Sequence, residues 1–298
     1  MRDDLDVDLL WQRALRLAGQ WSAATAPCRT DQRALLHGLH AQRRPGAGDS
    51  FWQFRPYERH EPALLIDWRR SARSDDLYVR ERERELSRGI WLFVDLSPSM
   101  RFRSSPDIDS KAARAVLIAL AAAKLLVDAG ERIALLGVHR RAAAGRFGLE
   151  RLRVGMHALS RETARSGGTL PDPGALPEHA RILMFGDFLD GQESLSAMFG
   201  RAIARRIDGH LLQICDPVEE DFPFRGRARF EGCEGEDPLL LDRAEDLAAD
   251  YRRRMAAHGT VLRDLAAHAG WTSGRHRTDR SAGPALLATM APGDAHRP

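Results

Sequence analysis

Five residues of this sequence carry side chains that bind hard metal ions, and most of them follow apolar segments of the chain. Asp95, Ser97 and Ser99 alternate after one apolar run, so a tight loop would direct all three side chains to one position. Thr169 follows two glycines, and Asp187 follows another apolar run. Carboxylate and hydroxyl oxygens suit Mg²⁺ better than a soft metal. The sequence therefore predicts a site for Mg²⁺, or for Mn²⁺ or Ca²⁺, and leaves its occupancy open.

Ordinary structural roles and catalysis are alternatives for the same residues. Ser97 and Ser99 are typical of turns, and Asp187 is a common type of helix N-cap. The sequence contains no GxSxG elbow, Walker loop, GxGxxG or HExxH motif. Asp95 could act as an aspartyl-phosphate nucleophile, although Ser97 stands where such enzymes usually carry a second aspartate. We therefore expect no enzyme and keep a metal-assisted phosphoester hydrolase using Asp95 as an alternative.

The elements that would position these residues alternate between strands and helices from residue 89 onward. Strands are expected at 90–94, 132–138, 181–186, 210–215 and 271–277, with a short one at 145–149. Helices are expected at 110–129, 150–165, 192–206, 243–269 and 283–290. This order predicts an α/β fold with an open, mostly parallel, Rossmann-like sheet and helices on both faces. In such folds, ligands bind beyond the carboxyl ends of the strands.

The flanking segments differ from this pattern. Residues 1–88 predict an N-terminal extension of helices, a loop over 43–50, and then an extended, aromatic and Arg-rich segment. The alternation in residues 77–85 is typical of an edge strand or ribbon. Residues 89–298 form the predicted sheet domain. Prolines and glycines predict a hairpin excursion from it at about 217–242.

Length and composition exclude several classes of protein. The chain has 298 residues, of which 43% are hydrophobic and 29% charged, and this excludes a largely disordered chain. No apolar run approaches the roughly 18–20 residues of a membrane span. The three cysteines give neither a disulfide framework nor CxxC metal spacing. We therefore expect a cytoplasmic protein.

The basic residues are almost all arginine, which raises the question of nucleic-acid binding. Only Lys111 and Lys124 are lysine among 45 basic residues, and 42 acidic residues leave a net charge of +3. Arginine pairs with phosphates and with carboxylates alike. Basic and acidic residues interleave along the chain, which favours pairing within the protein. An Arg-rich nucleic-acid binder therefore remains only an alternative.

The metal-ligand pattern resembles the metal-ion-dependent adhesion site, or MIDAS, of von Willebrand factor A-type domains. Such a site has DxSxS after the first strand, a threonine in a second loop and an aspartate after a later strand. The matching residues here are Asp95, Ser97, Ser99, Thr169 and Asp187. The resemblance implies that a partner protein supplies an aspartate or glutamate to the metal.

Residues from about 51 to 290 resemble a prokaryotic family, the domain of unknown function 58 proteins. The likeness rests on an RxY segment, an IDWxxSAR block, an Arg- and Glu-rich strand and the DxSxSM motif. These are Arg55–Tyr57, Ile66–Arg73, Leu77–Glu81 and Asp95–Met100, with further likeness in Cys215–Glu219, Phe222–Phe224 and Leu265–Leu287. His60, Glu61 and Leu65 depart from the family pattern, so that segment receives only a structural role.

This second resemblance implies a fold, a partner and a function. Family members are bacterial proteins with a von Willebrand A-like domain, often encoded beside MoxR-type AAA+ ATPases. They are thought to work with these ATPases as adaptor or chaperone-like modules that assemble or activate other proteins. The expected function is therefore metal-dependent protein interaction, with a MoxR-type AAA+ ATPase as a partner and no membrane span.

Overall fold

The computed structural model describes residues 5–24, 44–57, 68–71, 77–84, 89–166, 170–189, 191–233 and 237–291. Contacts divide the chain into two units, residues 1–38 with 89–298, and residues 39–88. The larger unit contains the sheet and the candidate site. Among the helices in the described ranges, none combines the length and apolar character needed to cross a membrane.

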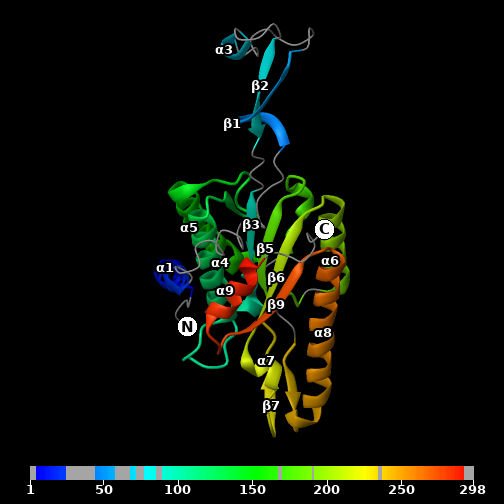
Figure 1. Ribbon diagram of the computed structural model, residues 1–298. Helices are drawn as coiled ribbons and strands as arrows, with labels where there is room; N and C mark the ends of the chain where they lie inside the picture. The colour runs from blue at the N-terminus through cyan, green and yellow to red at the C-terminus, as the bar shows by residue number, and fades with distance from the viewer. Residues whose placement is uncertain are drawn as a thin grey trace. The chain divides into compact units, whose positions relative to one another are not determined.

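A five-stranded parallel sheet organises the larger unit (Figure 1). Its strands are β3 (Ile90–Val94), β4 (Ile133–Leu135), β5 (Arg181–Gly186), β6 (Asp208–Cys215) and β9 (Thr272–Arg277). They lie in the order β4-β3-β5-β6-β9, and all neighbours pair in parallel. The central strands are almost entirely buried, as expected when helices cover both faces. The predicted Rossmann-like α/β fold is therefore confirmed.

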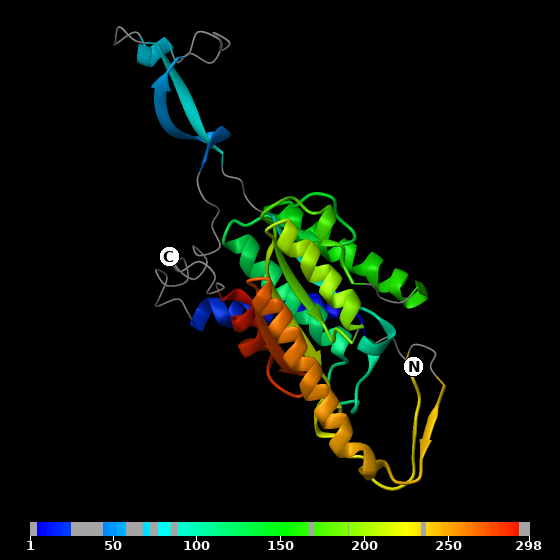
Figure 2. The same ribbon diagram turned by 90° about the vertical axis from the view of Figure 1, so that its right-hand side faces the viewer.

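Helices pack on both faces of this sheet (Figure 2). Helices α4 (Lys111–Asp128) and α9 (Ala282–Met290) lie on one face, and α6 (Gln192–Ala204) and α8 (Ala248–His268) lie on the other. Helix α5 (Gly145–Ser166) lies beside the edge strand β4. Burial of apolar side chains between these layers is the main favourable term in folding.

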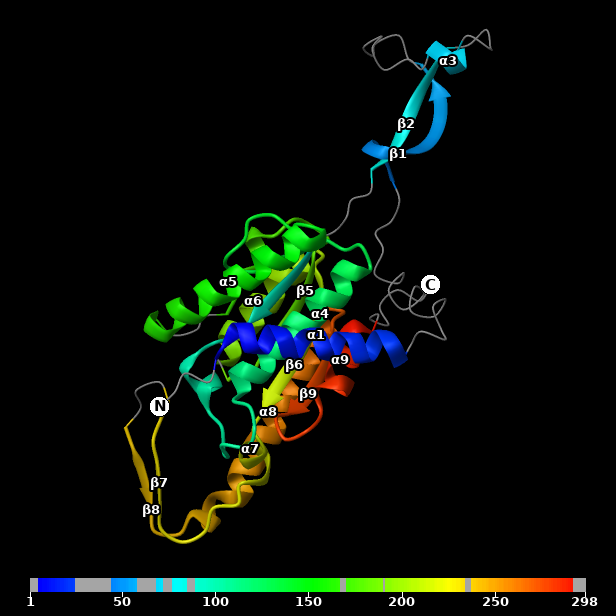
Figure 3. The same ribbon diagram turned by 90° about the vertical axis from the view of Figure 1, so that its left-hand side faces the viewer.

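The first helix, α1 (Val7–Ala24), packs against α4 (Figure 3). Val7, Leu10, Ala14 and Ala18 recur at helical spacing and are all buried. Helix α1 therefore belongs to the same unit as the sheet, whereas the sequence groups it with the N-terminal extension.

Helix α4 carries a charged residue into the interior. Ser110 caps the helix by accepting a hydrogen bond from the Ala113 N–H at 3.2 Å. Gly130 lies just beyond the other end with a φ of +91°, a conformation that glycine adopts without strain. Most side chains in between are buried. Lys111, the first residue of the helix, is buried with them.

One predicted strand of the larger unit is wrong, and another is longer than the strand observed. The segment 145–149 is the first turn of α5 and not a strand, and Phe147 within it is 68% exposed. The strand expected over 132–138 ends early because the chain turns at Gly137, which has a φ of +85°.

The smaller unit contains an antiparallel ribbon. Strand β1 (Arg44–Pro56) pairs with β2 (Tyr78–Arg84), and the short helix α3 (Trp68–Ser71) lies between them in the chain. The loop expected over 43–50 is therefore wrong for residues 44–50, which belong to β1. Pro45 and Ser50 both pair with Glu83 of β2, so the strand bulges between them, and a second register shift follows between Phe51 and Gln53.

Between β6 and α8 the chain leaves the sheet, in the region where the sequence predicts a hairpin. It forms the short helix α7 (Pro217–Asp221), then the antiparallel strands β7 (Ala228–Phe230) and β8 (Leu239–Leu241), then a 3₁₀ turn (Ala244–Leu247). This excursion starts at the carboxyl end of β6 (Figure 1). It therefore lies beside the loops that follow β3 and β5.

Candidate functional site

The carboxyl ends of β3 and β5 bring two aspartates to the same edge of the sheet. The Asp95 N–H donates to the Phe185 carbonyl oxygen at 2.8 Å, which extends the parallel ladder beyond β3. A Cβ atom at Gly186 would lie 2.8 Å from the Cβ of Asp95, so glycine is needed there. Asp95 and Asp187 are only 8% and 3% exposed.

Two serines connect these aspartates. Asp95 Oδ1 accepts a hydrogen bond from the Ser97 N–H at 2.8 Å, which closes a tight turn. Ser97 Oγ lies 3.1 Å from Ser99 Oγ, and Ser99 Oγ donates to Asp187 Oδ2 at 2.9 Å. Four of the five predicted site residues therefore lie together. Thr169 lies outside the described residues.

A buried lysine lies next to Asp187. Lys111 is 1% exposed, and its Nζ donates to Asp187 Oδ2 at 2.8 Å and to Glu219 Oε1 at 2.5 Å. Burial disfavours the ammonium, but the two carboxylates outweigh burial and raise the pKa of Lys111 above its ordinary value. The charged lysine therefore links the end of β5 to α7.

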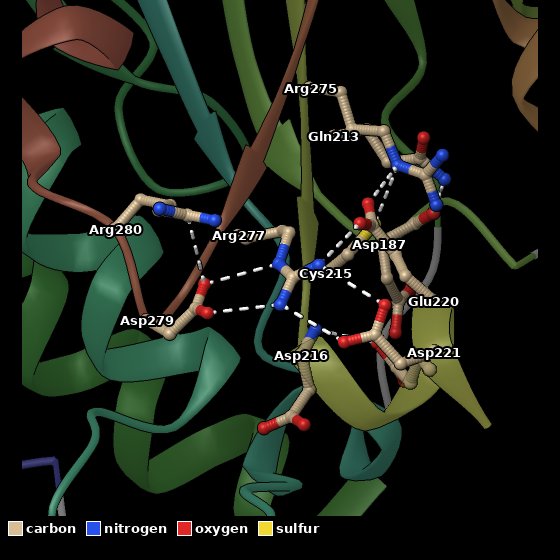
Figure 4. Close-up of polar contacts among 11 residues, drawn as sticks. Asp187, Gln213, Cys215, Asp216, Glu220, Asp221, Arg275, Arg277, Asp279 and Arg280 are labelled. Atoms are coloured by element: carbon tan, nitrogen blue, oxygen red, sulfur yellow. Dashed lines mark hydrogen bonds and ion pairs between the residues drawn. The ribbon is translucent and has the colours of Figure 1, made fainter. Parts of the chain in front are cut away.

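Ion pairs also hold α7 on the side of β9 (Figure 4). Glu220 pairs with Arg275 at 2.8 Å and with Arg277 at 3.3 Å, and Asp221 pairs with Arg277 at 3.2 Å. The fully buried Asp216 caps the helix. A five-residue helix has little stability of its own, so these contacts fix its position.

A pocket of about 420 Å³ opens at this edge of the sheet. We call one part the polar floor, formed by Asp95, Ser97, Ser99, Lys111, Asp187 and Glu219. We call another part the aromatic wall, formed by Phe222, Phe224, Phe230 and Tyr251. The loops after β3 and β5, together with α4, supply most of the polar floor. The excursion and α8 supply the aromatic wall.

The rings of the aromatic wall pack against one another. Phe222 lies at the centre, with ring centroids 5.2 Å from Phe224, 5.8 Å from Phe230 and 4.8 Å from Tyr251. Burial, with a smaller contribution from Glu219, raises the pKa of Tyr251 to about 12. The tyrosine hydroxyl therefore stays protonated at neutral pH.

The polar floor offers the kind of atoms that a hard divalent cation binds. Asp95 and Asp187 supply carboxylates, Ser97 and Ser99 supply hydroxyls, and this small set leaves coordination positions for water or another carboxylate. Within the described residues, no three His, Cys, Asp or Glu side chains are grouped to hold a metal. A cation here would depend on hydroxyl and water oxygens, and it would compete with Lys111 for Asp187.

Lys111, Glu219 and the aromatic wall are missed by reasoning from the sequence. One signal for Lys111 exists, because a rare lysine begins an otherwise apolar helix. For Glu219, the only signal in the sequence is the family likeness of residues 215–219. Phe222 and Phe224 lie in a segment that carries only a family likeness, and no spacing along the chain connects them to Tyr251.

The sequence similarity to known proteins extends over the whole candidate site. The profile of a family described as "Protein of unknown function DUF58" matches residues 53–261. Relatives include "Uncharacterized protein Mb1516" of Mycobacterium bovis and "Uncharacterized protein Rv1480" of Mycobacterium tuberculosis. Each is 27% identical over 247 residues, which cover 75% of this chain and 73% of the relative. The range matched by the family contains every residue of the polar floor and of the aromatic wall.

Proposed function

Because the chain belongs to the family described as "Protein of unknown function DUF58", we propose a function from its own site. The protein is a metal-dependent protein-interaction module of the von Willebrand A type. One observation carries the proposal: contacts run from Asp95 through Ser97 and Ser99 to Asp187 on the floor of a pocket. Mg²⁺ is the cation that this set of oxygens suits.

Each residue of the proposed site has a chemical role. Asp95, Ser97 and Ser99 supply oxygens to the cation, Asp187 does so directly or through water, and Thr169 is a further hydroxyl expected from the sequence. A bound divalent cation supplies positive charge and open coordination positions. An aspartate or glutamate from a partner would bind there more strongly than in a surface salt bridge.

The partner that we propose to test first is a MoxR-type AAA+ ATPase, which the family resemblance implies. The test is co-purification of the full chain with the MoxR-type ATPase of the same organism, in Mg²⁺ and in a chelator. We expect retention only in Mg²⁺. Equal retention in both buffers would contradict a metal-dependent contact.

Titration calorimetry with Mn²⁺ tests the cation site itself. The double variant Ser97→Ala/Ser99→Ala removes two hydroxyl ligands and should weaken Mn²⁺ binding by about tenfold or more. Ser104→Ala is the matched control, because Ser104 is exposed and lies outside the pocket lining. An unchanged Mn²⁺ affinity in the double variant, or no Mn²⁺ binding by the unaltered protein, would refute the proposal.

A further inference from the structure

The pocket has two chemically different sides that one ligand would meet together. On the excursion, Glu219 of the polar floor is followed within one turn by Phe222 of the aromatic wall. After β5, Asp187 of the floor is followed by Leu189, which also lines the pocket and is 48% exposed. A ligand group that reaches the floor therefore brings its neighbouring atoms onto apolar surface.

The aromatic wall retains surface that a ligand can cover. Phe222 is 8% exposed and lies at the centre of the cluster. Phe224, Phe230 and Tyr251 are only half-buried, and all three line the pocket. Covering such rings with one large apolar side chain strengthens binding by about tenfold or more. The wall therefore favours a ligand with an apolar side chain next to its polar group.

The charges of the polar floor determine which polar group can bind. Three carboxylates, those of Asp95, Asp187 and Glu219, line the pocket together with the ammonium of Lys111, which pairs with Asp187 and Glu219. Without a further cation, this floor repels a carboxylate and attracts a basic group. With a divalent cation bound, the charges balance and an open coordination position attracts a carboxylate.

We propose that the pocket binds a partner segment in which an aspartate or glutamate stands next to a large apolar residue. The acid binds the cation on the polar floor, and the apolar side chain lies on the aromatic wall. This inference rests on the proposed function, because the acid needs the cation.

Fluorescence anisotropy with labelled peptides tests the inference on the full-length protein. Three peptides differ only at the central pair, which is Asp-Phe, Asp-Ser or Lys-Phe. With saturating Mn²⁺, we expect the Asp-Phe peptide to bind about tenfold more tightly than the Asp-Ser peptide. The Lys-Phe peptide should bind least, and a chelator should abolish binding of the Asp-Phe peptide.

Two matched variants test whether the apolar side chain of the peptide contacts the aromatic wall. Phe224→Ser should remove the preference for Asp-Phe and leave Mn²⁺ affinity unchanged. Phe147→Ser should preserve the preference, because Phe147 is 68% exposed on α5 and lies outside the pocket lining. If Phe224→Ser does not fold, the affinities of the Asp-Phe and Asp-Ser peptides for the unaltered protein still test the inference.

The outcomes separate this inference from the proposed function. Failure of the unaltered protein to bind Mn²⁺ defeats the proposed function. Mn²⁺ binding combined with equal affinity for Asp-Phe and Asp-Ser overturns only the inference. Tighter binding of Lys-Phe, especially in chelator, also overturns it and would mean that the pocket accepts a basic side chain.

Discussion

At the scale of single residues, the ion pairs of Lys111 partly neutralise the carboxylates of the polar floor and fix their positions. Lys111 is 1% exposed, and its partners Asp187 and Glu219 have side chains exposed by 5% and 15%. Taking such charges out of water costs several kcal/mol per ion, which their mutual attraction offsets only while all partners are present. The three residues therefore hold α4, the end of β5 and α7 in one arrangement.

Replacing Lys111 with methionine should have two opposite effects. Lys111→Met leaves the buried carboxylate of Asp187 and the half-buried carboxylate of Glu219 without their ammonium, so we expect the free energy of unfolding to fall by about 3 kcal/mol or more. The same change removes the competitor of a metal ion for Asp187, so Mn²⁺ affinity should rise. Urea unfolding with and without Mn²⁺, together with calorimetry, measures both effects.

The other lysine of the chain provides a matched control. Lys124 pairs with Asp128 one helical turn later, and both side chains are substantially exposed. Lys124→Met should therefore change the free energy of unfolding by only about 0.5 kcal/mol or less. Equal losses of stability in the two variants, or weaker Mn²⁺ binding by folded Lys111→Met, would contradict the role given to Lys111.

The sequence could predict one half of the polar floor and not the other. Asp95, Ser97, Ser99 and Asp187 directly follow buried strands, and the carboxyl ends of parallel strands meet at one edge of a sheet. Lys111 instead binds partners that lie 76 and 108 residues later in the chain. Such contacts arise only from tertiary packing, which no local pattern specifies.

At the scale of elements, helix α1 is a structural part of the sheet domain. Its buried face consists of Val7, Leu10, Ala14 and Ala18, and it packs against α4. Arg13 on the same helix also makes a bidentate ion pair with Asp109, at 2.8 and 2.7 Å. Apolar periodicity predicts that these residues form a helix, but it does not identify the surface on which the helix packs.

Adjacent leucines in α1 test this packing. Leu10 is 2% exposed, whereas Leu9 is 56% exposed. Leu10→Ala should lower the free energy of unfolding by about 2–5 kcal/mol, because it removes buried methyl groups and leaves a cavity. Leu9→Ala should change it by about 0.5 kcal/mol or less. Similar losses in both variants, measured by urea unfolding of the full chain, would mean that α1 does not pack as described.

At the scale of the whole molecule, many arginines of the described ranges pair with acids. Arg153 with Glu150 and Arg253 with Asp250 follow the interleaving that the sequence displays. The ion pairs of α7 with β9, Glu220 with Arg275 and Asp221 with Arg277, join residues far apart in the chain. Only the fold brings these residues together. Composition therefore predicts that pairing occurs, and topology decides which pairs form.

Two buried histidines give the sheet domain a defined response to acid. His210 on β6 donates to or accepts from Thr272 through Nδ1 at 2.8 Å, and its Nε2 has no hydrogen-bond partner among the described residues. Burial, and then Arg181, lowers the pKa of His210 to about 4. Burial, and then Arg114, lowers the pKa of His276 on β9 to about 4. Both side chains are therefore neutral in the folded protein at neutral pH.

These shifts predict that the folded state loses stability as the pH falls from about 7 to about 5. In that window the histidines of the unfolded chain become protonated, near pH 6.5, whereas the folded ones stay neutral until about pH 4. The unfolded state then binds more protons, so each histidine lowers the free energy of unfolding by about 2 kcal/mol. His210→Gln and His276→Gln should each flatten the pH dependence measured by urea unfolding, and the double variant should flatten it nearly additively. If each variant kept the slope of the unaltered protein, the acid sensitivity would have to arise elsewhere in the chain.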